Sequence, residues 1–283
     1  MKYFILVLAL VCFALNSLIA RYVFNEDLLD EVTFTVIRLC SGAFVLILFL
    51  LLSKQKNRAL SQCGSWYGAI ALLVYLIGFS FAYTALDAGF GALILFVVVT
   101  FTMVIGGIIQ GQKLSLLQWG ALSVALLSLA YLLNPSVSHP NWYAVLAMGL
   151  SGIGWGAYSL HGTKLKLEGQ SPIQSTAGCF LRAMVFVPAI FPFISAIQFS
   201  WHGVVIGIIC GAITSGVGYV LWYQSLFWLQ VDKAATMQLS VPVITLISGV
   251  LFLGESVSVI QCICAVLIVL SIGFYLKQKS RLG

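Results

Sequence analysis

Two arginines lie inside long apolar segments of this chain, where a guanidinium group could recognise an anion. Arg38 and Arg182 each stand among uncharged residues, and keeping a charge in a membrane helix costs roughly 3 kcal/mol. A guanidinium facing the protein interior can bind a carboxylate or a phosphate through two parallel hydrogen bonds. Alternatively, each arginine hydrogen-bonds helix-end carbonyl groups or reaches a lipid headgroup. Their similar places in two similar segments also fit a shared structural role.

Aromatic side chains form the second group of candidates. Tyr219, Trp222 and Tyr223 are spaced i, i+3, i+4 and therefore share one helical face. Such a face could line a cavity and contact an amphipathic or aromatic solute through stacking and cation–π interactions. Aromatic residues near segment ends would instead lie at the membrane–water interface. The residues that fit this interfacial belt are Trp66, Tyr67, Trp142, Tyr143 and Trp228. The full set of candidate solute-binding residues is Asn16, Arg38, Tyr75, Phe79, Tyr83, Trp155, Tyr158, Arg182, Tyr219, Trp222, Tyr223 and Gln238.

A few polar residues and one proline complete the candidates. Asn16 lies mid-segment, and a buried amide needs partners, so it faces the interior for helix packing or for solute binding. Gln238 precedes Pro242, whose missing N–H bends a helix and exposes a backbone carbonyl. Pro242 is therefore the candidate hinge, although a simple packing kink fits equally well. His161 stands alone, which is more typical of a satisfied interfacial residue than of a proton carrier.

The cysteines, histidines and acids do not form a recognisable catalytic or metal site. No pair among the seven cysteines has zinc or redox spacing, and the three histidines belong to no HExxH motif. We therefore expect no enzyme activity, no cofactor and no metal. No Asp or Glu is predicted deep in an apolar segment, which favours exchange or uniport over proton coupling.

The elements that must position these residues are membrane helices. The chain of 283 residues is 61% hydrophobic and 8% charged, with a mean hydropathy of +1.08, whereas soluble domains are about 25% charged. This composition excludes a soluble enzyme, a disordered chain and a conventional nucleic-acid binder. Apolar runs without period-two alternation favour helices over a membrane barrel. The prediction is an all-α integral membrane protein with ten transmembrane helices at 3–22, 32–53, 66–86, 90–110, 115–133, 142–163, 173–197, 203–227, 234–253 and 257–276.

Basic residues are concentrated in every second predicted loop, and this pattern predicts the orientation of the chain in the membrane. The acids Glu26, Asp27, Asp30, Glu31, Asp87 and Glu255 lie on the other side, where Arg21 at a segment edge is the sole basic residue. Because the positive side is cytoplasmic, we expect a multi-pass inner-membrane protein with both termini in the cytoplasm. Arg21 also disfavours cleavage of the first segment as a signal peptide. The basic set is Lys2, Lys54, Lys56, Arg58, Lys113, Lys164, Lys166, Lys233, Lys277, Lys279 and Arg281.

The chain repeats itself with an offset near half its length. The segment G-Q-K-L-S-L-L-Q around Lys113 resembles G-E-S-V-S-V-I-Q around Glu255, about 142 residues later. Tyr83-x-x-Leu86 likewise matches Tyr223-x-x-Leu226. These matches predict two five-helix repeats, at 1–138 and 139–283. Since five is odd, the second repeat enters the membrane from the opposite side, which gives the inverted repeats of many secondary transporters.

These features resemble the EamA-type branch of the drug/metabolite transporter superfamily. The residues on which this resemblance depends are the glycine-rich Gly152–Gly156 segment, the helix residues Arg38 and Arg182, and Val241-Pro242-Val243 followed by Gly254-Glu255. The resemblance covers essentially the whole chain, although Thr100 stands where the first repeat should hold a proline. It implies a secondary transporter that exports small organic metabolites, such as amino acids or related amphipathic solutes, by alternating access.

Other functions of the same architecture stay open. The resemblance also fits a lipid-linked sugar flippase or a nucleotide-sugar or phosphometabolite exchanger, and a non-transporting membrane subunit is a further alternative. The expected partners are a small-molecule solute and the lipid bilayer, with no nucleic acid. The expected assembly is a monomer or a weak homodimer.

Overall fold

The protein is a bundle of membrane-length helices. The computed structural model describes residues 1–53, 59–86, 88–132, 141–190, 199–253, 258–278 and 281–282, without the side chains of 88–90, 132, 249–253 and 281–282. Nearly all of these residues are helical, apart from turns and a short β1–β2 pairing of Gln112–Lys113 with Arg281–Leu282. Asp87 and the Gly254-Glu255 motif lie outside the described residues.

The helices follow the predicted segments closely in both halves of the chain. The first half contains α1 (Lys2–Asn25), α2 (Glu31–Leu52), the short η1 (Leu60–Gln62), α3 (Trp66–Tyr83), α4 (Ala88–Ile109) and α5 (Leu116–Leu132). The second half contains α6 (Trp142–Leu167), α7 (Pro172–Met184), α8 (Val187–Ile190), α9 (Trp201–Ile209), the π-helical η3 (Cys210–Val217), α10 (Gly218–Leu226), α11 (Val231–Gln238), α12 (Val241–Leu253) and α13 (Val259–Lys277).

Six helices of the described residues are long and apolar enough to cross a membrane. They are Lys2–Asn25, Glu31–Leu52, Trp66–Tyr83, Gly91–Ile109, Trp201–Leu226 and Val259–Lys277. The other four predicted segments correspond to α5, which has 17 residues, to α6, and to helices interrupted after Met184 and after Gln238. The fold is therefore all-helical, and the count of ten crossings stays a prediction.

One helix in each half of the chain begins with the same pair of side-chain-to-backbone hydrogen bonds. The Ser115 hydroxyl accepts from the Gln118 N–H at 3.2 Å, while the Gln118 side chain accepts from the Ser115 N–H at 2.9 Å. Ser258 and Gln261 form the same reciprocal pair at the start of α13. Such capping boxes satisfy first-turn N–H groups that have no helical partner. The sequence similarity near Lys113 and Glu255 thus corresponds to two equivalent helix starts.

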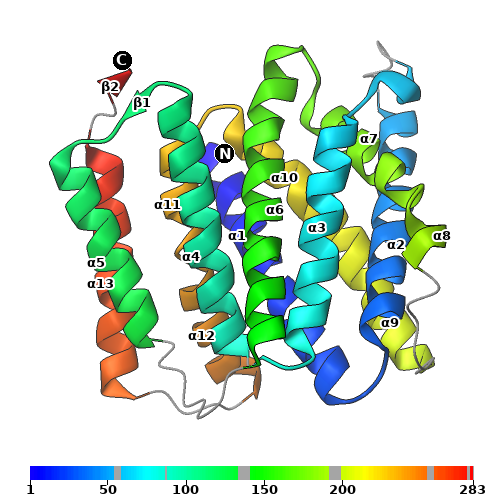
Figure 1. Ribbon diagram of the computed structural model, residues 1–283, viewed down its shortest axis with the longest axis horizontal. Helices are drawn as coiled ribbons and strands as arrows, with labels where there is room; N and C mark the ends of the chain where they lie inside the picture. Colours follow the sequence, from blue (N-terminus) through cyan, green and yellow to red (C-terminus); the bar gives the residue numbers. More distant parts are fainter. Residues whose placement is uncertain are drawn as a thin grey trace.

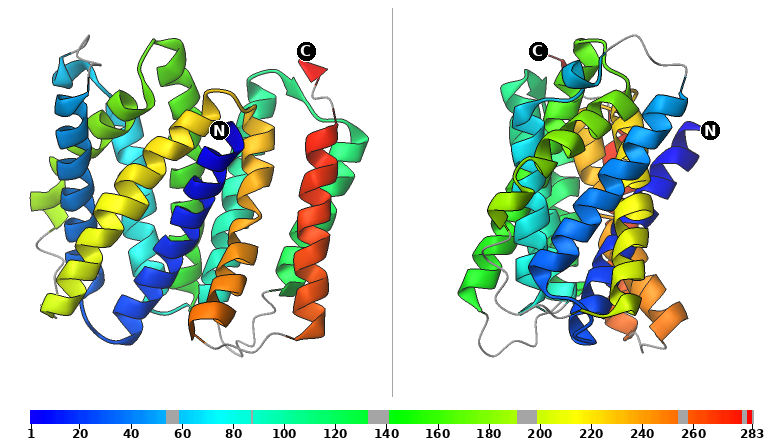
Figure 2. Two further views of the ribbon diagram at one scale, coloured as in Figure 1. Left: turned by 180° about the vertical axis from the view of Figure 1, so that it is seen from behind. Right: turned by 90° about the vertical axis from the view of Figure 1, so that its right-hand side faces the viewer.

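The N-terminus and the C-terminus of the chain lie on the same side of the helix bundle (Figures 1 and 2). The ends of α6 and α13 there carry Lys164, Lys166 and Lys277 in their last turns. The α1–α2 connection, which carries Glu26 and the helix-capping Asp30, lies at the opposite end in Figure 1. These three lysines therefore lie at the opposite end of the bundle from Glu26 and Asp30, although the acid Glu168 lies at the lysine end.

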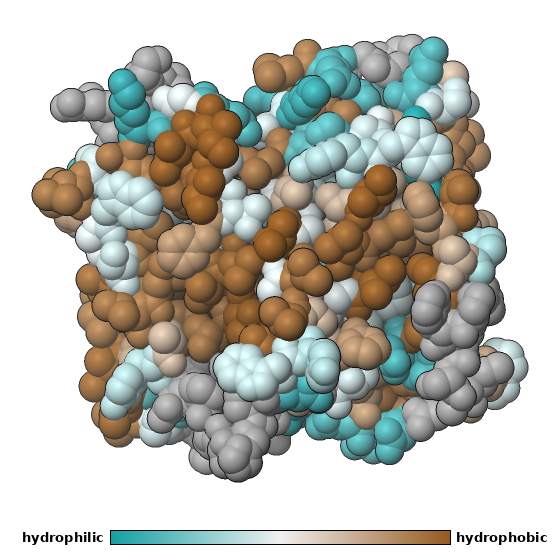
Figure 3. Space-filling model, in the orientation of Figure 1, coloured by the Kyte–Doolittle hydropathy of each residue, from teal (hydrophilic) through white to brown (hydrophobic). Residues whose placement is uncertain are grey.

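On the face shown in Figure 3, apolar residues cover the middle of the surface and polar residues lie toward both ends. Large apolar side chains such as Leu127, Phe44 and Ile105 are exposed on the membrane-length helices. Trp66, Tyr67, Trp142 and Tyr143 are exposed at helix starts, as expected for interfacial aromatic residues. This surface matches the hydrocarbon core of a bilayer.

The glycines of α6 allow that helix to lie against α3 and α4 (Figure 1). A Cβ atom on Gly154 would meet the Tyr75 backbone nitrogen at 2.7 Å, and one on Gly152 would meet Val98 at 2.8 Å. Small residues permit this close approach in membrane bundles. The glycine-rich segment therefore seats α6 deeply and carries Trp155 into the centre of the protein.

We expect Gly154→Ala to destabilise the protein, because its Cβ would collide with the backbone of α3, which cannot move aside. Overpacking of this kind costs about 1–3 kcal/mol. The measurement is the thermal unfolding temperature of the detergent-purified protein. Gly149→Ala is the matched control on the same helix, since its Cβ meets nothing within 4 Å. Equal unfolding temperatures for the two variants would show that the α3–α6 contact is not limiting.

Candidate functional site

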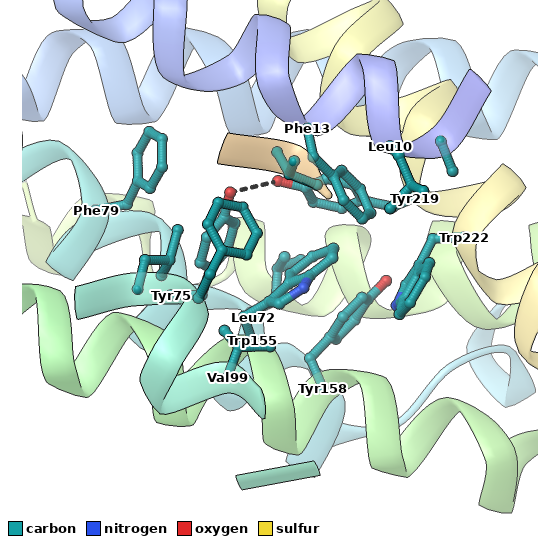
Figure 4. Packing of buried hydrophobic residues seen from close by; sticks show 14 of the residues in the cluster. Leu10, Phe13, Leu72, Tyr75, Phe79, Val99, Trp155, Tyr158, Tyr219 and Trp222 are labelled. Carbon is teal, nitrogen blue, oxygen red and sulfur yellow. Dashed lines mark hydrogen bonds between the residues drawn. The ribbon is translucent and has the colours of Figure 1, made fainter. Parts of the chain in front are cut away.

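A cluster of aromatic rings fills the centre of the bundle (Figure 4). Trp155 of α6 lies at its middle, with ring centroids 4.9 Å from Tyr75 of α3 and 4.6 Å from Tyr219 of α10. Phe13 of α1 closes the cluster at 5.0 Å from Trp155. All four side chains are buried. The structure thus brings together candidates from α3, α6 and α10, which lie far apart in the sequence.

The predicted aromatic face of α10 packs against α6. The Trp222 indole N–H donates to the Ser159 hydroxyl at 2.9 Å, and the Tyr223 hydroxyl donates to the Tyr158 carbonyl at 2.7 Å. The Tyr158 and Tyr223 rings also stack, with centroids 4.8 Å apart. These contacts hold three of the predicted site residues, Tyr158, Trp222 and Tyr223, in the interface between α6 and α10.

Arg38 is fully buried beside the cluster and is held by neutral groups. Its Nε atom donates to the Ser215 hydroxyl at 2.6 Å, and one terminal nitrogen donates to the hydroxyls of Tyr219 at 2.7 Å and Tyr75 at 3.1 Å. The guanidinium carbon lies 5.1 Å from the Phe79 ring centroid. The other terminal nitrogen, Nη1, has no hydrogen-bond partner among the described residues. The site therefore contains a buried cation with donor capacity left over for an anionic group.

The π-helical segment η3 shapes the surroundings of Arg38. Asn16 of α1 donates to the Thr214 carbonyl at 3.3 Å and accepts from the Thr214 hydroxyl at 2.6 Å. The Ser215 hydroxyl also lies 3.3 Å from the Asn16 amide oxygen. π-Helical turns are frequent at functional sites. Asn16 is thus engaged in packing α1 onto η3, and Ser215 links this contact to Arg38.

The space left between the rings is very small. A cavity of about 10 Å³ is lined by residues of α1, α3, α4 and α6, including Ser17, Phe79 and Phe96. That volume holds about one water molecule. Tyr83 continues the α3 face, with its ring 4.7 Å from Phe79. A solute can enter the centre of this arrangement only after the helices or rings move.

The ninth predicted helix is interrupted shortly before Pro242. α11 ends at Gln238 and α12 begins at Val241, with Leu239 and Ser240 in a turn between them. Pro242 therefore sits in the first turn of α12, where its missing N–H costs no helical hydrogen bond. Gln238 accepts from the Trp155 indole N–H at 2.7 Å. The break is consistent with the predicted hinge, and motion there stays a prediction.

Arg182 lies away from the aromatic cluster and binds backbone carbonyls. It donates to the carbonyls of Cys63 and Ser61, and to that of Gly178 at 3.1 Å. The two arginines therefore have different partners among the described residues: Arg38 meets side-chain hydroxyls and Arg182 meets backbone carbonyls. The His161 ring has a hydrogen-bond partner, because its Nε2 atom lies 2.5 Å from the Ser65 hydroxyl.

Sequence reasoning missed several residues that the fold places here. Phe13 lies one turn before Asn16 on the same face of α1, and Thr214-Ser215 is a polar pair between glycines, so both had a local signal. Asp232 had no such local signal, because the predicted helix started at residue 234 and left Asp232 in a loop. α11 begins at Val231 and leaves Asp232 only 1% exposed. Asp232 is therefore a buried carboxylate in the first turn of a helix, while the expectation that no Asp or Glu lies deep in an apolar segment stays a prediction.

Known proteins resemble this chain over most of its length. A model of the EamA-like transporter family matches residues 1–134 and 142–276. Uncharacterized protein PA1977 of Pseudomonas aeruginosa is 40% identical over 250 residues, covering 88% of this chain and 85% of that protein. Threonine/homoserine exporter RhtA of Escherichia coli strain K12 is 29% identical over 170 residues, covering 58% of this chain and 55% of RhtA. A solved structure titled "Crystal structure of protein" has a TM-score of 0.74 at 13% identity, over 95% of this chain and 96% of that one, which shows the same fold.

We expect Tyr219→Phe to lower the stability of the folded protein, because it removes a hydroxyl that solvates the buried charge of Arg38. Hydrogen bonds to charged groups contribute about 1.5–3 kcal/mol. Thermal unfolding in detergent measures the change, and Tyr143→Phe is the control, since that ring is exposed. If both variants unfold at the temperature of the unaltered protein, the Tyr219 hydroxyl does not solvate Arg38.

Proposed function

The chain belongs to the EamA-like transporter family, and on that premise we propose that it exports small organic metabolites, such as amino acids or related amphipathic solutes, across the inner membrane. The family consists of membrane transporters rather than enzymes. The proposal concerns the solute, its direction and the mechanism of movement.

Arg38 is the observation that carries this proposal. None of its described hydrogen-bond partners is a carboxylate, so its charge is solvated by hydroxyls and by the Phe79 and Tyr75 rings alone. A solute carboxylate would supply the missing negative charge and accept from Nη1. The surrounding rings would contact the ammonium group or the apolar part of the solute. One cation in one aromatic box suits a zwitterion with a single carboxylate.

The same geometry weighs against a phosphorylated solute. A phosphate or nucleotide sugar carries more negative charge than one guanidinium neutralises. The other arginine considered, Arg182, is used on backbone carbonyls at the end of the bundle. The printed name of the RhtA relatives gives threonine and homoserine as their solutes, and this chain spans about half the length of those proteins. That likeness supports an amino acid as the solute class.

Alternating access would open the filled centre of the bundle. The break at Leu239–Ser240 and the π-helical η3 are two places where the helices can bend without breaking regular hydrogen bonds. We take the repeats to be 1–138 and 139–283, in opposite orientations. With the basic end in the cytoplasm, both termini are cytoplasmic and the acidic α1–α2 connection faces the other side.

We expect Arg38→Lys to abolish transport in proteoliposomes, with at least a tenfold loss of counterflow, because an ammonium cannot replace the forked donors of a guanidinium. The probes are radiolabelled threonine, homoserine and phenylalanine, with glucose 6-phosphate as the phosphorylated alternative. Arg182→Lys is the matched control and should retain counterflow, since lysine can still donate to a carbonyl.

Three results would contradict the proposal. Full counterflow by Arg38→Lys would show that Arg38 does not contact the solute. Counterflow of glucose 6-phosphate alone would favour the phosphometabolite exchanger. No flux of any probe through the folded, unaltered protein would favour a non-transporting subunit.

A further inference from the structure

A cavity lies between α1, α11 and α13 at the end of the bundle where both chain termini are found (Figure 1). Its volume is about 290 Å³, near the lower end of the range for small-molecule pockets, about 300–1,000 Å³. The space between the rings at the centre is only about 10 Å³. An amino-acid-sized solute therefore has room in this cavity while the centre is filled. The lining residues are Tyr3, Leu6, Trp228, Leu229, Gln230, Lys233, Met237 and Leu276.

Lys233 of α11 brings a positive charge to this cavity. Its side chain is partly buried, and it has no hydrogen-bond or ion-pair partner among the described residues. The neighbouring acid, Asp232, is buried and accepts a hydrogen bond from Tyr275 of α13. Consecutive residues of a helix point about 100° apart, so the two charged side chains of α11 face different surroundings. The Lys233 ammonium therefore keeps its donors for an anionic group in the cavity.

Trp228 supplies a second unused donor at the wall of the cavity. Its indole Nε1 atom is buried and has no hydrogen-bond partner in the part of the chain that the structure describes. The Trp228 ring meets Tyr3 edge to face, with centroids 5.4 Å apart. Lys166 of α6 donates to the Phe227 carbonyl and so anchors the segment that carries this indole. A buried N–H without an acceptor costs free energy, which a bound anion would recover.

Two helices connect this cavity to the aromatic centre. Met237 of α11 lines the cavity, and the next residue, Gln238, accepts from the Trp155 indole N–H at 2.7 Å. Leu6 of α1 also lines it, and Phe13, seven residues later on the same face, packs 5.0 Å from Trp155. Seven residues of a helix span about 10 Å. A solute in the cavity would therefore lie about two helical turns from the centre.

We propose that this cavity is the cytoplasmic loading site of the exporter, where Lys233 and the Trp228 N–H bind the carboxylate of an amino-acid solute. The inference rests on the proposed export function and deepens it. A cation beside aromatic rings repeats the chemistry found around Arg38, so one zwitterion fits both places. Lys233 binds as a single point charge, whereas Arg38 offers forked donors. The solute can thus pass from a weaker outer site to a stronger central one.

A lipid phosphate is the competing anion, because lysines near the cytoplasmic surface attract anionic headgroups. The depth of the cavity favours the solute. It reaches Leu6, which is fully buried, and Met237, the neighbour of the residue that holds Trp155. A headgroup bound at the membrane surface would not need this inward extension.

The test measures solute capture from the cytoplasmic side. Everted membrane vesicles present that side to the bath, and the initial uptake of radiolabelled threonine and phenylalanine is measured over a concentration series. We expect Lys233→Gln to raise the half-saturating concentration at least threefold and to keep the maximal rate within twofold, because capture is weakened while the centre is unchanged. Lys233→Arg keeps the cation and should rescue capture. Lys277→Gln, an exposed lysine at the same end, is the matched control and should change neither value.

Trp228→Phe gives a second readout, since it removes the N–H and keeps an aromatic ring. We expect it to raise the half-saturating concentration in the same direction as Lys233→Gln. Unchanged half-saturating concentrations in both variants would overturn the inference alone. A lower maximal rate of Lys233→Gln with an unchanged half-saturating concentration would assign a structural role and also overturn it.

Proteoliposomes of defined composition separate the solute from the lipid. The effect of Lys233→Gln on half-saturating counterflow should persist in phosphatidylcholine alone and in its mixture with phosphatidylglycerol. An effect confined to the mixture would assign Lys233 to a lipid phosphate and overturn the inference. No uptake of either probe by the unaltered protein overturns the proposed function, and the inference with it.

Discussion

The buried charge of Arg38 is the constraint on which the centre of this protein depends. A guanidinium cannot remain inside a lipid-embedded bundle unless protein groups replace its water. Here Ser215 of η3 and the hydroxyls of Tyr75 and Tyr219 take that place. These groups come from three elements, so solvating one charge fixes α2, α3 and the α9–η3–α10 helix relative to one another. Ser215 lies in the π-helical segment η3.

The aromatic cluster follows from the same requirement and from the glycines of α6. Gly152 and Gly154 let α6 approach α4 and α3 within distances that a Cβ would forbid. Trp155, which directly follows Gly154, is thereby placed against Tyr75 and Tyr219, the same tyrosines that bind Arg38. Charge solvation and ring packing thus share two side chains. A movement that opens the centre must disturb both interactions together.

The two repeats have kept their helices and diverged in their chemistry. Ser115–Gln118 and Ser258–Gln261 cap equivalent helices with the same hydrogen bonds. Arg38 and Arg182, by contrast, bind different groups: Arg38 donates to side-chain hydroxyls, and Arg182 donates to backbone carbonyls. Asp232 lies in the second repeat, at the start of α11.

The sequence by itself determined the membrane class, the helix positions within a few residues, the duplication and the family. These depend on local properties: the length of apolar runs, the spacing of side chains on one helix, and short capping motifs. The tertiary structure alone decided that Arg38 meets Ser215, 177 residues away, and that Arg182 meets a loop instead. It also decided that Asp232 is buried and accepts a hydrogen bond from Tyr275 of α13. Apolar helices can pack in many registers with similar hydrophobic energy, so the partner of each polar group is fixed only when all helices are in place.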